Sequence, residues 1–134
     1  MTKKIDYVYT TGKRRESSAR VRLFKGKGVN TVNGIPAFDY FPGKIMKVML
    51  EKPFGVTETF HNYYFSAKVV GGGKMGQIGA LVHGLARAIA KASPEKFRPL
   101  LKKAGLLTRD SRTRQRRMVG MGGKSRRAKQ SPKR

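Results

Sequence analysis

The last 26 residues of the chain, 109–134, cannot build a hydrophobic core, and this limits what the chain can fold into. They carry eleven Lys or Arg side chains against a single acid, Asp110, and only four apolar residues. The apolar surface that they can bury is too small to offset the entropy lost when they become ordered. We therefore expect a globular α+β body at 1–108 and a long basic tail at 109–134, which stays disordered unless a partner neutralises its charge.

Positive charge is spread over the whole chain and is not confined to the tail. The formal net charge is +24, and both the body and the tail are basic. A charge of this size favours a bound state with a polyanion, and nucleic acid is the natural partner. An anionic membrane would require an amphipathic helix with bulky apolar residues on one face, and the tail has no such face. The composition therefore predicts a nucleic-acid-binding protein without a membrane partner.

Several other classes of site are disfavoured by composition. The chain has no cysteine, so it has neither a disulfide framework nor a thiolate metal site. His61 and His83 are the only histidines, and no acids cluster near either in sequence. The first ten residues lack the apolar run of a secretory signal, and the longest apolar segment, 78–92, is too short and too charged to span a bilayer. We expect a cytoplasmic protein with no catalytic residues, metal, cofactor or small-molecule substrate.

The first third of the chain shows the patterns of a β-meander. Residues 5–11 are typical of a strand, and charged and apolar residues alternate at 20–23, which places Arg20 and Arg22 on one face. A short return strand at 29–32 is followed by Asn33-Gly34, a tight-turn pair that tolerates positive φ. We predict an antiparallel meander with a basic outer face.

The rest of the chain predicts helices around one further strand. We expect a short helix from Lys44 that ends at Pro53 and Gly55, a strand at 63–70 and a helix at 75–91. Ser93-Pro94 has the composition of a helix start with a capping hydroxyl; Pro99 should kink or divide that helix, Gly105 should end it, and Thr108 should cap one more short turn.

Two side-chain rows distinguish the predicted helix at 75–91. One row forms the predicted core stripe: Ile78, Leu81, Val82, Leu85 and Ile89. The other contains only small residues: Gly76, Ala80, Gly84 and Ala88. A row without bulky side chains allows either a sheet or a sugar-phosphate backbone to approach closely.

A glycine motif lies between the strand at 63–70 and the next helix. Gly71 to Gly76 fits GxGxxG, the pattern of a dinucleotide site, but the second parallel strand of such a unit is missing because 93–105 reads as helical. The segment is otherwise a simple strand end and helix start. In a third interpretation, the bare amides of Gly71, Gly72 and Gly73 and the side chain of Lys74 bind a phosphate of RNA.

Basic residues also gather outside the tail. Lys13-Arg14-Arg15, Arg20 and Arg22 place five cations within ten residues, more than an ordinary solvated face requires. Arginine outnumbers lysine in the tail, which suits bidentate phosphate contact. The strand aromatics, among them Tyr7, Tyr9 and Tyr64, either fill the core or stack on bases, and the sequence leaves both readings open.

These landmarks together resemble one family, the ninth protein of the bacterial-type small ribosomal subunit. The resemblance runs from about Tyr9 to Arg134 and rests on separated motifs. They are Thr11–Arg15 with Ala19–Val21, Asn33-Gly34 followed by Tyr40-Phe41, Gly71–Gly73 with Gly76-Gln77, Ala86–Ala88, and the most specific piece, Leu101–Asp110.

The resemblance implies a four-stranded sheet with helices packed on it, similar to the second domain of ribosomal protein five, and a long C-terminal extension. It implies a structural, non-enzymatic role in translation, with ribosomal RNA in the head of the small subunit and neighbouring head proteins as partners. It also implies that Lys133 and Arg134 contact the anticodon stem-loop of peptidyl-site tRNA. The family usually ends Gln-Phe-Ser-Lys-Arg, whereas residues 130–134 are Gln-Ser-Pro-Lys-Arg and lack the aromatic.

From charge, motif and resemblance together, one set of residues is predicted to contact ribosomal RNA. The set is Lys13, Arg14, Arg15, Arg20, Arg22, Gly71, Gly72, Gly73, Lys74, Gln77, Arg87, Arg109, Arg112, Arg114, Arg116, Arg117, Lys124, Arg126, Arg127 and Lys129. Two alternatives stay open at this point. One is a stand-alone nucleic-acid chaperone, and the other is a small nucleotide-dependent enzyme that uses the glycine motif.

Overall fold

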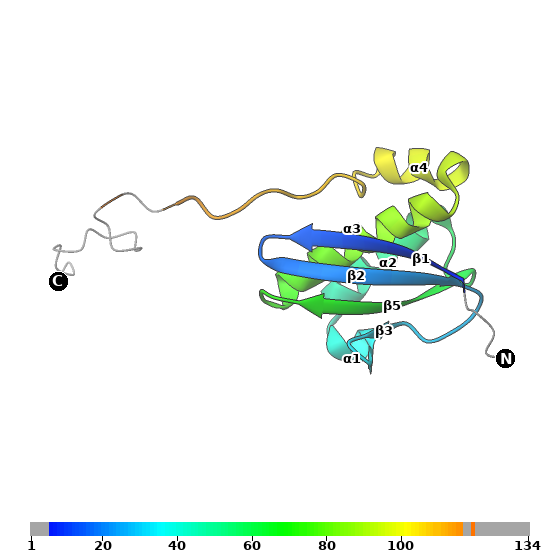
Figure 1. Ribbon diagram of the computed structural model, residues 1–134, viewed down its shortest axis with the longest axis horizontal. Helices are drawn as coiled ribbons and strands as arrows, with labels where there is room; N and C mark the ends of the chain where they lie inside the picture. Colours follow the sequence, from blue (N-terminus) through cyan, green and yellow to red (C-terminus); the bar gives the residue numbers. More distant parts are fainter. Residues whose placement is uncertain (1–5, 117–118, 120–134) are drawn as a thin grey trace.

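The computed structural model describes residues 6–116 and 119, which form an α+β fold with a five-stranded sheet and helices on one of its faces (Figure 1). The elements in chain order are β1 Tyr7–Arg14, β2 Ser17–Lys25, β3 Thr31–Val32, β4 Ile35–Pro36, α1 Ala37–Tyr40, α2 Lys44–Thr57, β5 Tyr63–Val70, α3 Lys74–Ala92 and α4 Pro94–Lys103. None of the helices in this described part is long and apolar enough to cross a membrane.

The sheet has the strand order β1-β2-β5-β3-β4, so the predicted meander is wrong. β5 lies between β2 and β3, antiparallel to β2 and parallel to β3. The reason is hydrogen bonding: β5 pairs with β2 along the whole of its own length, whereas β3 offers only two residues. The backbone N–H and C=O groups along a long strand are better satisfied by a long partner strand, even one that is distant in sequence.

The resemblance implied four strands, whereas the sheet has five, and the two at one edge, β3 and β4, have only two residues each. β3 and β4 pair through Val32 and Ile35 across the predicted tight turn. Asn33 and Gly34 have φ values of 53° and 80°, so both residues adopt the left-handed conformation that the pair predicted.

One face of the sheet is buried and the other is open. On β2, Ala19, Val21 and Leu23 are almost completely buried, whereas Arg20 and Arg22 are exposed, as the alternation predicted. From β5, Phe65, Ala67 and Val69 join the same buried face. In Figure 1, α2 and α3 lie behind the sheet and leave its front face uncovered.

The row of small residues on α3 faces the sheet. A side chain at Gly12 of β1 would overlap the carbonyl oxygen of Ala80 and the backbone of Gly84. The Thr10 hydroxyl donates a buried hydrogen bond of 2.8 Å to the Gly84 carbonyl. A protein strand, and not a sugar-phosphate backbone, therefore packs against this row. The predicted core stripe is confirmed, with Val82 only partly buried and the other four residues fully buried.

α2 continues past the residues that were expected to end it. Pro53 lies inside the helix, which runs to Thr57 and is followed by Glu58 in the left-handed conformation, with φ of 54°. The Thr57 hydroxyl donates to the Pro53 carbonyl at 2.9 Å. Pro53 and Phe54 are buried, so packing outweighs the hydrogen bond that proline removes.

α4 differs from expectation at its first turn and in its interior. Pro99 does not divide it, and the Ser93 side chain makes no capping hydrogen bond; the Ser93 carbonyl instead accepts from the Phe97 N–H at 3.0 Å. Gly105, with φ of 77°, follows the helix end as predicted. No helical turn follows Thr108, since residues 106–116 are irregular.

Candidate nucleic-acid interface

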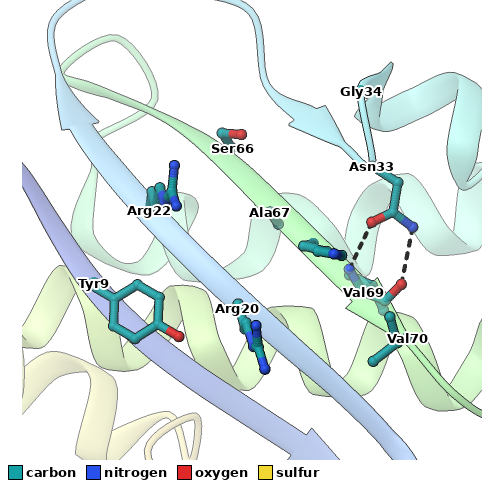
Figure 2. A pocket seen from close by; sticks show the side chains of 10 residues that line it. Tyr9, Arg20, Arg22, Asn33, Gly34, Ser66, Ala67, Val69 and Val70 are labelled. Atoms are coloured by element: carbon teal, nitrogen blue, oxygen red, sulfur yellow. Dashed lines mark hydrogen bonds between the residues drawn. The ribbon is translucent and has the colours of Figure 1, made fainter.

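The open sheet face carries a groove lined by cationic side chains (Figure 2). Arg22 stands between Tyr9 of β1 and Ser66 of β5, and Arg20 is directly opposite Lys68 of β5. The groove has a volume of about 670 Å³ and no acidic residue lines it. Cations without internal counter-charges in an open, shallow groove suit an extended polyanion.

Lys68 was missed by the sequence reasoning. It is exposed, and it lines the groove beside Arg20. The signal was present, because alternation along 63–70 places Lys68 on the same face as Ser66. Lys68 could be assigned to the groove only once the pairing of β5 with β2 was known. Asn33 forms the rim, where its side-chain amide accepts from the Val69 N–H at 2.8 Å and donates to the Val69 carbonyl at 3.0 Å (Figure 2).

The aromatic residues divide between the core and the open face of the sheet, and base stacking stays a prediction for the exposed ones. Phe41 and Phe65 are buried in the core, whereas Tyr7 and Tyr9 are 48% and 44% exposed on the open face. The Arg22 guanidinium lies 5.3 Å from the centroid of the Tyr7 ring. Flat exposed rings beside a guanidinium offer stacking surfaces for unpaired bases.

The glycine loop is shaped by the neighbouring β1–β2 hairpin. Gly71 and Gly72 have φ of 79° and 64°, and a side chain on either would collide with the Glu16 carbonyl or the Ser17 hydroxyl. Ser17 donates a hydrogen bond of 3.0 Å to the Gly71 carbonyl. Gly73 is open to solvent, because a side-chain carbon added there would meet nothing within 4 Å. Close packing accounts for the first two glycines, and phosphate binding by the loop stays a prediction.

Lys74 and Gln77 lie in the first turn of α3, and Gln77 contacts the glycine loop. The Lys74 ammonium lies 3.3 Å from the centroid of the Tyr40 ring. The Tyr40 hydroxyl donates to Gln77 Oε1 at 2.9 Å, and Gln77 Nε2 donates to the Gly71 carbonyl at 3.1 Å. Both predicted RNA contacts therefore already have partners within the protein.

The row of His83, Arg87 and Lys91 on α3 lies along the outer edge of β1. Arg87 donates to the Thr11 carbonyl, and Lys91 donates to the Tyr9 carbonyl at 3.4 Å. Burial lowers the pKa of His83, and the nearby positive charge of Arg87 adds to this shift. His83 is accordingly neutral at pH 7 and adds no charge to the row. These side chains cover an edge strand whose carbonyls would otherwise be unpaired.

The first residues after α4 return along the body to the hairpin. Leu106 and Leu107 pack against the core, and the Leu107 carbonyl lies 3.2 Å from His83 Nε2. Asp110 then lies 3.4 Å from the Arg14 guanidinium and accepts from Arg112 Nη2 at 2.8 Å. This places Arg14 and Arg112 close together, while Arg109 is exposed near His83 and Arg116 is exposed further along.

The remaining predicted tail residues lie outside the described residues. They are Arg117, Lys124, Arg126, Arg127, Lys129, Lys133 and Arg134.

The contacts of Asp110 with Arg112 and Arg14 can be tested through the pKa of the Asp110 carboxyl. Hydrogen bonds from the Arg112 side chain and backbone hold the pKa of Asp110 well below its usual range, with Arg14 contributing less. The stabilisation is therefore present above the ordinary carboxyl pKa and is lost as pH falls through the lower folded value. We expect Arg112→Ala to raise the Asp110 pKa more than Arg14→Ala does, as measured by carboxyl ¹³C NMR titration. A larger effect of Arg14→Ala would contradict the arrangement.

Comparison with known proteins adds independent information to this geometry. A family model described as Ribosomal protein S9/S16 matches residues 12–134. The chain is 42% identical over 118 residues to the small ribosomal subunit protein uS9 of Maridesulfovibrio salexigens, an alignment that covers 88% of this chain and 90% of that protein. The residues matched by the family model include the glycine loop, the segment after α4 and nearly all of the groove.

Proposed function

The chain belongs to the ribosomal protein S9 family, and on this premise we propose that its open sheet face and its hairpin end bind ribosomal RNA in the head of the small subunit. The body and the tail have different roles. The body fixes a position on the RNA, and the tail extends from that position along RNA that the body does not touch.

Family membership itself settles the broader role. The chain is a structural component of the small subunit of the cytoplasmic ribosome, acts in translation as part of a ribonucleoprotein, and is not an enzyme. It therefore has ribosomal RNA and other ribosomal proteins as its partners. The nucleotide-dependent enzyme that the glycine motif left open is set aside on this ground.

The observation that carries the RNA proposal is the groove on the open sheet face. Arg20, Arg22 and Lys68 line it and no acid does, so a phosphate backbone can replace the missing counter-charges. Contacts of this kind position the protein on RNA and read little sequence. The exposed Tyr9 ring in the same groove adds a surface on which an unpaired base can stack.

Replacing Lys68 with glutamine tests the groove. We expect Lys68→Gln to reduce the slope of log affinity against log salt by about 1, because one phosphate contact is lost. Fluorescence anisotropy with a fragment of small-subunit head RNA measures this slope. Lys52→Gln on α2 is the matched control, since it removes the same charge from an exposed lysine on the helical side. Equal losses in both variants would mean that affinity follows net charge and would count against the groove.

For the tail, we propose contact with ribosomal RNA through Arg126, Arg127 and Lys129 and contact with peptidyl-site tRNA through Lys133 and Arg134. The support is the family resemblance and the density of charge at these positions. Residues 112–134, if extended, reach about 75–80 Å, well beyond the body. Such contacts act by charge neutralisation and counterion release.

A further inference from the structure

Arginines from two distant parts of the chain meet at the hairpin end of the molecule. Arg14 ends β1 and Arg15 follows it in the turn, while Arg112 and Arg114 come from the irregular segment after α4. Together with Thr113 they line one open depression of about 510 Å³. The return of the chain along α3 and β1 is what brings the two pairs together.

The acidic side chains of the described residues do not balance the positive charge of this arginine cluster. Asp110 accepts from Arg112 Nε at 2.9 Å and from Nη2 at 2.8 Å, and it also forms the ion pair with Arg14. These are the ion pairs found among residues 6–116 and 119, so Arg15 and Arg114 have no carboxylate partner there. Four guanidinium groups thus share one carboxylate, which leaves the depression strongly electropositive.

The Arg14 side chain is held in position by packing. A side chain on Gly79 of α3 would overlap Arg14 Cδ, so the arginine lies directly against the helix. Its guanidinium is only partly exposed, and its Nε has no hydrogen-bond partner among the described residues. A prepositioned guanidinium loses less conformational entropy on binding than a free surface side chain does.

We propose that Arg14, Arg15, Arg112 and Arg114 form one composite phosphate-binding site, which takes a phosphodiester group of an RNA backbone. The site rests on the proposed RNA-binding function and makes it more specific, because half of its ligands come from the body and half from the start of the tail. A phosphate bound there neutralises both halves at once and ties the start of the tail to the body. Arginine forks match the two non-bridging oxygens of a phosphodiester.

Arginine side-chain NMR on the full chain tests this site, with inorganic phosphate as the first probe and a four-nucleotide oligouridine RNA as the second. We expect the Hε–Nε signals of Arg14 and Arg112 to shift together and to saturate with one affinity for each probe. Arg114→Lys keeps the charge but removes the fork, and it should weaken that affinity about threefold to tenfold. Arg98→Lys on α4 is the matched control and should leave the affinity unchanged, because Arg98 is exposed and lines neither the sheet groove nor this depression. Arg114 is exposed and outside any helix or strand, so its substitution does not threaten folding.

Two results would overturn the site. Non-saturating shifts that include Arg20 and Arg22 equally would indicate a diffuse ion atmosphere. Equal effects of Arg114→Lys and Arg98→Lys would indicate that affinity follows positive charge and not the geometry of the site. Either result, with the Lys68→Gln effect retained, would reject this site and leave the proposed RNA-binding function standing. Absence of the Lys68→Gln effect with saturating shifts here would reject the sheet groove instead.

Discussion

Replacing Gly12 with alanine is expected to lower the free energy of unfolding by more than about 3 kcal/mol, because β1 has no space for a side chain there. The added carbon would overlap backbone atoms of Ala80 and Gly84 on α3. Backbone atoms of a packed helix cannot move aside as the end of a flexible side chain can. The change would push β1 away from α3 and weaken the buried hydrogen bond from Thr10 to Gly84. Urea denaturation followed by circular dichroism measures the loss.

Gly55→Ala is the matched control for this experiment. Gly55 is exposed in the last turn of α2, and an added carbon there would be 3.6 Å from the Phe60 ring, an ordinary contact. Alanine is favoured over glycine in helices, so this variant should be neutral or more stable by up to about 1 kcal/mol. A loss below about 1 kcal/mol for Gly12→Ala would show that α3 can shift away from the sheet, contrary to the packing described.

Removing residues 117–134 is expected to reduce the slope of log RNA affinity against log salt by about 5, since seven Lys or Arg residues are lost. Salt titration with the head RNA fragment measures the slope. An unchanged slope would mean that the body supplies all the phosphate contacts, and it would contradict the proposed role of the tail.

A smaller change separates tRNA contact from assembly. The double substitution Lys133→Gln and Arg134→Gln keeps the length of the tail and removes its last two charges. We expect normal incorporation into small subunits but faster dissociation of peptidyl-site tRNA from them. Lys124→Gln with Arg126→Gln removes the same charge nearer the body and serves as the control. Identical tRNA dissociation in the wild-type and Lys133/Arg134 variants would refute the proposed contact.

Local patterns predicted the elements of the fold well but their arrangement poorly. The alternation at 20–23 and the core stripe of α3 identified the buried faces, because each depends on the period of a single element. The place of β5 in the sheet depends on competition between distant strands for the edge of β2, which no local pattern contains. Pro53 likewise remains inside α2, where it is buried. The exposed Pro99 remains inside α4, which is packed on the body through the buried Phe97 and Leu101.

The candidate site, like the fold, could be predicted only in part from local patterns. Arg20 and Arg22 were predicted from one strand, whereas Lys68 was missed because it joins them only through the pairing of β2 with β5. Asp110 stood out as the one acid of the basic tail, but its place beside Arg14 depends on the return of the chain from α4. Sequence reasoning found most of these cationic residues but not the way in which distant parts of the chain bring them together on one surface.

The inner position of β5 also constrains how the newly made chain can fold. Translation delivers β1 and β2 first, yet the second edge of β2 has no long partner until residues 63–70 have left the exit tunnel. A nascent chain of about 60 residues therefore carries an unpaired strand edge, which promotes aggregation, and the positive charge of the segment opposes it. Completion of the sheet is non-local and is correspondingly slow. The topology makes the emergence of β5 the event that commits the chain to its native structure.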